Sequence, residues 1–160
     1  MSVSFSGSEL INIAIDIERR GVAFYDTMAR STESAATGDA FRYLADMERQ
    51  HIQTFQDMLT EADKLQLLES YTQEHAAYLV ALVDSAVFTD DLVTGEMVTR
   101  TDSDIEALEL AISAEKDSVL FYYEMRDIMP RPTHPTINRI IAEEKSHLRQ
   151  LSQLKKGLSR

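Results

Sequence analysis

The chain has 160 residues, enough for a single domain over residues 1–160 that buries a substantial core. It contains no cysteine, which excludes disulfides, thiolate metal sites and iron–sulfur clusters. Its formal net charge of −11 argues against nucleic acid or an anionic membrane as partner, because both require clusters of basic residues. The sequence has no apolar run of membrane-spanning length and no recognisable signal peptide, so we expect a soluble, cytoplasmic protein.

The first part of the chain predicts two helices joined by a short connection. Ser6 and Glu9 have the spacing of a capping box, which predicts a helix over about 7–31. The polar segment Ser31–Gly38 is typical of a short connection, and a second helix is predicted over about 39–62. Because short loops join antiparallel neighbours, these two helices should form a hairpin.

The stretch over about 63–102 is predicted to be a long crossover. Its first half, Leu65–Val87, has apolar residues at helical spacing and predicts an extra helix. Its second half, which contains Gly95 and several acidic residues, is typical of a loop. A connection this long can travel the length of a bundle, so that the next helix starts at the same end as the first.

The last part of the chain predicts a second helical hairpin. A capping-box spacing at Ser103 predicts a helix over about 103–128. Pro135 suits the first turn of a final helix over about 135–156, with Gly157 as its C-cap. The sequence therefore predicts an all-α four-helix bundle whose long crossover contains an extra helix.

A glutamate interrupts the apolar stripe of each of the four long predicted helices. The stripes step by 3, 4, 3, 4 and 3 residues, which keeps their side chains on one helix face. Buried carboxylates are so costly that they pair, take up a proton or bind a metal. Two of the glutamates have a histidine three residues later, which places the two side chains next to each other. The six candidate metal ligands are Glu18, Glu48, His51, Glu115, Glu144 and His147.

The two halves of the chain repeat this pattern. The separation between the two glutamates is nearly the same in each half, and Tyr25 and Tyr122 occupy matching positions. The repeat predicts two hairpins related by a pseudo-twofold axis, with the two Glu-x-x-His pairs facing each other. Buried acid–histidine hydrogen bonds without a metal are the alternative interpretation of the same residues.

The chemistry of this ligand set favours two hard or borderline cations. One glutamate from each of two helices and Glu-x-x-His from each of the others is the ligand set of di-iron and di-manganese carboxylate bundles. Four carboxylates would balance the charge of two divalent ions. Oxygen-rich ligation with one imidazole per metal suits iron or manganese, although zinc or cobalt could enter the same site. We expect two metal ions per chain, preferably iron, and the metal cluster rather than a side chain as the reactive group.

Four motifs carry a resemblance over nearly the whole chain: Glu18-x6-Tyr25, Glu48-x-x-His51, Glu115-x6-Tyr122 and Glu144-x-x-His147. They resemble the ferritin-like domain of the rubrerythrin family, whose members without a rubredoxin domain are sometimes called erythrin. The resemblance implies a ferritin-like fold, a di-iron centre and a homodimer. It also implies a role under oxidative stress, in which an oxidoreductase reduces hydrogen peroxide or dioxygen with electrons from an external carrier such as rubredoxin.

The sequence departs from that family's pattern in two places. Ser118 stands where peroxidase members carry an additional glutamate, which leaves six ligands rather than seven and weighs against efficient peroxide reduction. A rubredoxin domain is missing, so we expect electrons from a separate partner. A ferroxidase, or an iron-binding or delivery protein without peroxidase turnover, is the alternative function. A purely structural bundle is the third.

Small and aromatic residues near the candidate ligands allow two interpretations each. Gly21 and Ser118 could leave space above the metals for dioxygen or peroxide, or could allow close helix packing. Tyr25 and Tyr122 could hydrogen-bond a ligating carboxylate, or pack in the core through their rings. Tyr123 is off that face and is expected to pack.

Three further residues are given no direct metal-binding role. His75, in the crossover helix, and His134, in the proline-rich turn, are interpreted as structural or surface histidines. Glu143 precedes a candidate ligand but points about 100° away from it, so it is expected to be solvated or to touch a ligand from outside.

Overall fold

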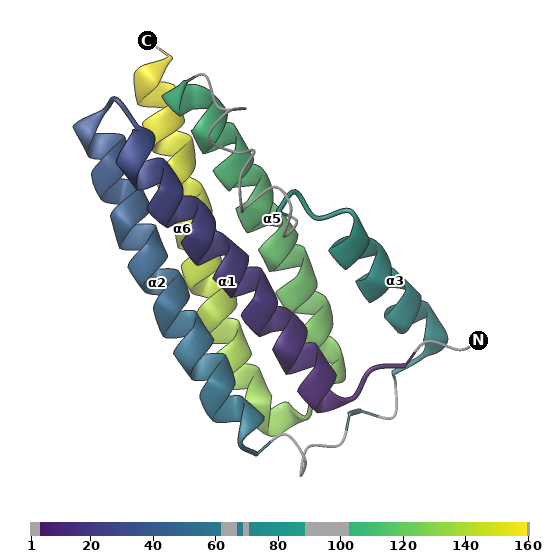
Figure 1. The fold of residues 1–160 in the computed structure, drawn as a ribbon. Coiled ribbons are helices and arrows are strands. Elements are labelled where there is room, and N and C mark those ends of the chain that lie inside the picture. Colours follow the sequence, from purple (N-terminus) through teal and green to yellow (C-terminus); the bar gives the residue numbers. More distant parts are fainter. Residues whose placement is uncertain (1–3, 62–66, 69–70, 89–102, 160) are drawn as a thin grey trace.

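The computed structural model describes residues 4–61, 67–68, 71–88 and 103–159. Helices dominate these residues and no strand occurs among them, which confirms the predicted all-α class. None of the helices described is long and apolar enough to cross a membrane. Figure 1 shows four long helices side by side, with the shorter helix α3 along one flank.

The first hairpin consists of α1, Gly7–Ser31, and α2, Ala35–Leu59. At the start of α1 the Ser6 hydroxyl accepts a hydrogen bond from the Glu9 N–H at 3.1 Å. The Glu9 side chain accepts one from the Ser6 N–H in return, which confirms the predicted capping box.

The boundaries of α2 differ from the prediction. The helix spans Ala35–Leu59, so the predicted range of 39–62 was wrong by a few residues at each end. The Ser34 hydroxyl caps the helix by accepting a hydrogen bond from the Thr37 N–H. Asp104, 70 residues further along the chain, accepts a 2.9 Å hydrogen bond from the Ser34 N–H. The polar composition of the segment predicts a longer connection, because the contact with Asp104 that helps to fix the start of α2 is remote in sequence.

The crossover contains the expected extra helix, α3, at Gln73–Asp84. It is shorter than the helical pattern over Leu65–Val87, because a capping box sets its start. The Thr72 hydroxyl accepts a hydrogen bond from the His75 N–H, and the His75 ring accepts one from the Thr72 N–H. The predicted loop at residues 89–102 lies outside the described residues.

The second hairpin consists of α5, Asp104–Ile128, and α6, His134–Leu158. A short 3₁₀ turn, η3, lies between them at Arg131–Thr133. The Ser103 hydroxyl caps α5 by accepting a 3.2 Å hydrogen bond from the Glu106 N–H. The start of this hairpin is therefore set as the sequence indicates.

The ends of α6 agree with the prediction at one side only. Pro135 lies in the first turn, as expected. Gly157 is not the C-cap, because the helix continues to Leu158 and no glycine among the described residues has a positive φ. The Ser159 N–H bonds to the Lys155 carbonyl at 3.1 Å, so this end needs no left-handed residue.

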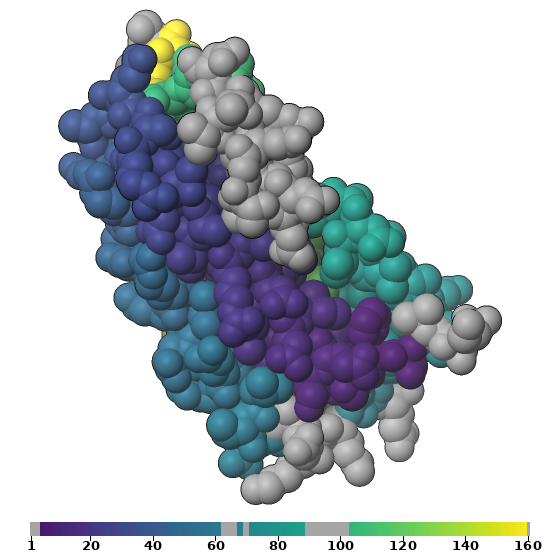
Figure 2. All heavy atoms as spheres, viewed as in Figure 1, coloured from purple at the N-terminus to yellow at the C-terminus, as the bar shows by residue number. Residues whose placement is uncertain are grey.

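The apolar core forms two clusters, at the two ends of the bundle. All four long helices contribute to both, and a layer of buried glutamates and histidines lies between them. Figure 2 shows the face made by α1 and α2, with α3 at its edge. Representative members of the first cluster are Leu10, Ile11, Phe55, Met125 and Ile137. Representative members of the second are Phe24, Met28, Phe41, Leu108 and Leu151.

Candidate metal centre

Six acidic and imidazole side chains meet in the polar layer at the middle of the bundle. One comes from α1, two from α2, one from α5 and two from α6, and none is more than 4% exposed. The structure thus brings together all six residues that the sequence singles out. They are Glu18, Glu48, His51, Glu115, Glu144 and His147.

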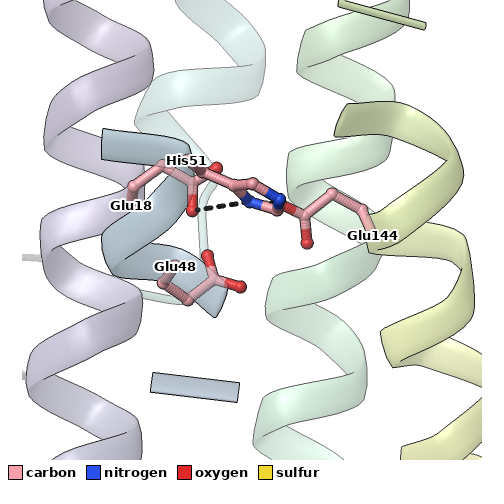
Figure 3. Close-up of side chains that lie close together, drawn as sticks. All are labelled: Glu18, Glu48, His51 and Glu144. Atoms are coloured by element: carbon pink, nitrogen blue, oxygen red, sulfur yellow. Dashed lines mark ion pairs between the residues drawn. The ribbon is translucent and has the colours of Figure 1, made fainter. Parts of the chain in front are cut away.

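The six residues form two overlapping groups of four, and each group could hold one cation. Within each group, one potential ligand atom per residue lies within 4.8 Å of the others. Glu48 and Glu144 belong to both groups. Glu18 and His51 complete the first group, whose side chains converge from three helices in Figure 3. Glu115 and His147 complete the second group. The shared glutamates therefore lie between the two groups.

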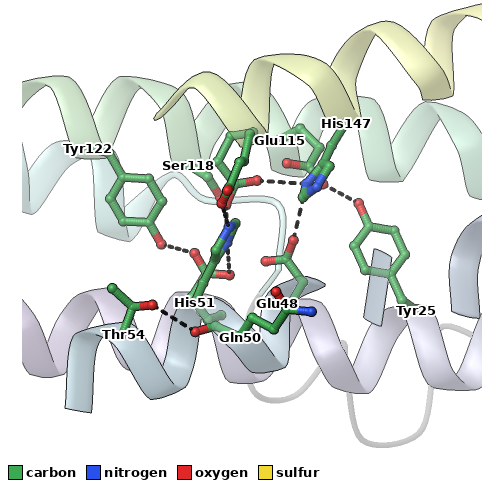
Figure 4. Close-up of polar contacts among 12 residues, drawn as sticks. Tyr25, Glu48, Gln50, His51, Thr54, Glu115, Ser118, Tyr122 and His147 are labelled. Atoms are coloured by element: carbon green, nitrogen blue, oxygen red, sulfur yellow. Dashed lines mark hydrogen bonds and ion pairs between the residues drawn. The ribbon is translucent and has the colours of Figure 1, made fainter. Parts of the chain in front are cut away.

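Each histidine turns its Nδ1 atom toward the carboxylates. His51 Nδ1 lies 2.9 Å from Glu144 Oε1 and 3.6 Å from Glu18 Oε2. His147 Nδ1 lies 3.3 Å from Glu144 Oε2 and 3.4 Å from Glu48 Oε1. The two imidazole rings are nearly parallel, with their centroids 5.9 Å apart. Figure 4 shows both histidines between the hairpins, with His147 in contact with Glu48.

Several potential ligand atoms of this cluster are buried and make no well-directed hydrogen bond among the described residues, although the histidine–carboxylate contacts above bring most of them close together. Buried polar atoms normally have hydrogen-bond partners, so such a concentration of exceptions is typical of a site that binds a ligand. Oxygen and imidazole lone pairs are the donors that iron and manganese accept, and the residues present therefore fit a pair of such cations. The unpartnered atoms are Glu18 Oε2, Glu48 Oε1, His51 Nδ1, Glu144 Oε1 and His147 Nε2.

Two tyrosines hold the carboxylates that are not shared. The Tyr25 hydroxyl donates a 2.5 Å hydrogen bond to Glu115 Oε1, and the Tyr122 hydroxyl donates one to Glu18 Oε1. Burial, together with the nearby carboxylates, raises the pKa of both phenols well above the usual value, so they remain donors. Each tyrosine bonds a glutamate of the opposite hairpin. The two hairpins are thus joined by hydrogen bonds on both sides of the centre.

Burial and mutual repulsion shift the pKa values of the clustered groups. Burial, reinforced by the Glu144 carboxylate, raises the pKa of the Glu48 and Glu115 carboxyls well above the usual range. Burial also acts to raise the pKa of Glu144, but contacts with Glu115 and both histidines outweigh it and lower that pKa. Burial opposes a charged His51, yet contacts with Glu144 and a second glutamate raise its pKa to about 11. Without a cation, Glu48, Glu115 and His51 would therefore hold protons, whereas the Glu144 carboxylate would stay ionised.

A small pocket leads to the shared glutamate Glu48 from the side of α3. Its walls include Gly21, Ser118 and Glu115, with Leu82 at the α3 end, and its open volume is about 40 Å³. That volume holds a few water-sized molecules. A Cβ atom at position 21 would lie 3.3 Å from Glu48 Oε2, so the missing side chain makes room for this carboxylate. The small residues that the sequence pattern singles out thus line a pocket next to the candidate ligands.

The contact of Glu143 decides between the two expectations for this residue, because it touches a candidate ligand from outside. Glu143 Oε2 lies 2.7 Å from His51 Nε2, on the outer side of the ring. The only sequence signal was its position directly before Glu144 on the last helix. Its partner lies on a different helix, which the spacing along one helix does not reveal.

The remaining histidines have structural roles. His75 belongs to the capping box of α3. His134, the first residue of α6, donates a 2.8 Å hydrogen bond from Nε2 to the Met129 carbonyl. Tyr123 packs its ring against two cationic groups. Those of Arg126 and Lys145 lie 4.9 and 4.8 Å from the ring centroid.

The bundle, its long crossover and the central glutamate–histidine cluster define a ferritin-like protein with a candidate metal centre. The model of the rubrerythrin family matches residues 9–155, so the chain belongs to that family. A similar solved structure is that of a Thermotoga maritima protein, provisionally described as a ferritin-like diiron-carboxylate protein. The two chains are 31% identical, each is covered to 95%, and the TM-score is 0.70. No curated protein matches the chain.

Proposed function

We propose that this protein is a non-haem di-iron carboxylate oxidoreductase that reduces hydrogen peroxide or dioxygen with electrons from a separate carrier. The observation that carries the proposal is the set of unpartnered, buried donor atoms in two overlapping four-residue groups. A purely structural hydrogen-bonded cluster would leave fewer such atoms without a partner. Membership of the rubrerythrin family supports the same proposal.

The chain would hold two iron ions through separate and shared ligands. Glu18 and His51 would serve one ion, Glu115 and His147 the other, and the glutamates common to both groups would bridge them. Two bound ferrous ions would supply two electrons, enough to cleave the O–O bond of hydrogen peroxide or to reduce dioxygen to hydrogen peroxide. Manganese suits the same donors, and a mixed pair is compatible with them.

The protein's own residues would select and orient the oxidant. The pocket beside Glu48 admits water-sized molecules, so it favours peroxide or dioxygen over an organic substrate. The hydroxyls of Tyr25 and Tyr122 fix the orientation of the unshared carboxylates. Reduction of hydrogen peroxide to two waters consumes two protons and two electrons, and a separate one-electron carrier of the rubredoxin type would replace the electrons.

Anaerobic reconstitution with ferrous iron tests the proposal. Protein loaded with about two ions per chain, the number set by this ligand class, is mixed with hydrogen peroxide while ferric absorbance is recorded. Turnover is then measured with a reduced carrier. We expect peroxide consumption to be fast in the wild type and lost in the double variant Glu18→Gln, Glu115→Gln. Glu33→Gln, which changes an exposed carboxylate, serves as the control.

The outcomes separate this function from iron handling. Oxidation and retention of many ferrous ions per chain, without sustained peroxide consumption, would establish ferroxidase or iron-binding activity and refute the proposed turnover. Peroxide consumption no faster than in the double variant would refute it as well. Metal analysis of protein purified from its cells identifies whether iron or manganese is the native metal.

A further inference from the structure

The two candidate histidine ligands differ on their outer sides. Both are 2% exposed and both turn Nδ1 toward the carboxylates. His51 Nε2 lies 2.7 Å from the Glu143 carboxylate. His147 Nε2 is buried and has no hydrogen-bond partner among the residues that the structure describes. The pseudo-twofold symmetry of the two hairpins is therefore broken at this point.

The sequence accounts for the asymmetry. Glu143 comes directly before Glu144 on α6 and reaches across to the histidine of α2. The matching position on α2, directly before Glu48, is Met47. A thioether is only a weak acceptor and carries no charge, so it does not replace a carboxylate as the partner of an imidazole N–H.

A carboxylate on the outer nitrogen has a defined effect on a metal-binding imidazole. It accepts the Nε2 proton, so that Nδ1 keeps its lone pair on the side that faces Glu18 and Glu144. It also fixes the orientation of the ring and makes the imidazole a stronger donor. His147 lacks this support. Fixing the orientation and tautomer of its ring would cost free energy and so weaken metal binding.

We propose that Glu143 is a positioning residue for His51 and that it makes the two metal positions unequal, with tighter binding at the position served by His51. The inference rests on the proposed function, because it assumes that the six residues bind two metal ions. It assigns a role to Glu143, whose side chain is 34% exposed and lies on the outer side of the His51 ring. It also predicts that Met47 is the reason for the weaker position.

Cobalt(II) is a suitable probe, because it accepts the same ligands and its visible spectrum reports binding directly. The full chain is stripped of metal with a chelator and titrated with cobalt in two backgrounds. In the His147→Ala background only the position with His51 is complete, and in the His51→Ala background only the position with His147 is complete. Circular dichroism establishes that each variant is folded.

Adding Glu143→Ala is expected to weaken cobalt binding about tenfold in the His147→Ala background, the lower end of the effect of such outer partners. It should leave affinity in the His51→Ala background unchanged. Glu143→Gln should recover part of the loss, since its carbonyl oxygen still accepts the Nε2 proton. Met47→Glu is expected to strengthen binding only in the His51→Ala background.

An equal effect of Glu143→Ala in both backgrounds, or no effect in either, would overturn the inference. A failure of the proposed function gives a different result: position-dependent cobalt binding as described, together with no peroxide reduction by the iron-loaded wild type. Absence of any specific metal binding would refute the function and the inference together.

Discussion

The hydroxyl of Tyr25 on α1 donates a 2.5 Å hydrogen bond to Glu115 on α5, across the boundary between the two helical hairpins. Tyr122 on α5 makes the reciprocal contact with Glu18 on α1. The two unshared carboxylates of the candidate centre are therefore each held by the hairpin to which they do not belong. This arrangement couples the packing of the hairpins to the geometry of the centre.

Removal of one of these hydroxyls should destabilise the protein. Tyr25→Phe leaves a buried carboxylate without its donor, and we expect a loss of about 1–3 kcal/mol in the free energy of unfolding. The measurement is urea unfolding of chelator-treated protein. Tyr78→Phe, at a tyrosine that is 44% exposed, is the control. Equal stability of the two variants would show that the hydrogen bond to Glu115 contributes nothing.

The shared and unshared glutamates should differ in their effect on metal content. Because Glu48 belongs to both groups of ligands, we expect Glu48→Ala to bind no metal tightly, whereas the wild type should bind about two ions per chain. Glu18→Ala removes a ligand from one group only and should retain about one ion. Native mass spectrometry of reconstituted protein gives these numbers. The same metal content in both variants would contradict the division into shared and unshared ligands.

Gly21 should be required for the position of the Glu48 carboxylate. In Gly21→Ala the new methyl group would lie 3.3 Å from Glu48 Oε2, so that the carboxylate must shift by a few tenths of an ångström. We expect weaker metal binding under limiting metal. Gly157→Ala is the matched control, because a Cβ there meets no atom within 4 Å. Indistinguishable metal affinities in the two variants would mean that Gly21 serves helix packing alone.

Without a bound cation, the stability of the protein should fall as pH rises. The pKa values of Glu48 and Glu115 are raised in the folded state, so their contribution is complete below the usual value of about 4.5 and is lost at higher pH. The pKa of His51 is raised from 6.5 to about 11, so its contribution is lost across that interval. Both effects have the same sign, because each removes stability as pH rises.

Thermal unfolding of chelator-treated protein measures this dependence. The melting temperature should decrease steadily as pH rises from 6.5 toward 11, the interval between the usual pKa of histidine and the raised pKa of His51 in the folded state. Added ferrous or cobalt ions should restore it, because the cation replaces the lost protons. Glu48→Gln, which cannot ionise, should show a flatter profile. A melting temperature of the chelated wild type that rises over this interval would contradict the assignment of protons to the cluster.

Much of the fold follows from local patterns in the sequence. The capping box at Ser6 sets the start of α1, and apolar residues at helical spacing identify the long helices. The start of α2 was predicted too late, because the Ser34 N–H bonds to Asp104 in the other hairpin. Gly157 was assigned as a C-cap from its residue type, yet the backbone there stays helical. Local signals predict an element well and its ends less well when a remote residue completes the cap.

By itself, the sequence determined which side chains must be buried together. A glutamate in each of four apolar stripes, two of them followed by a histidine, has this meaning because helical periodicity is a local property and an unpaired buried carboxylate is costly. Only the tertiary structure decided which helix supplies each partner: that Tyr25 bonds Glu115, and that Glu143 bonds His51. These contacts cross between helices, where the distance between two side chains depends on how the hairpins pack rather than on their spacing along the chain.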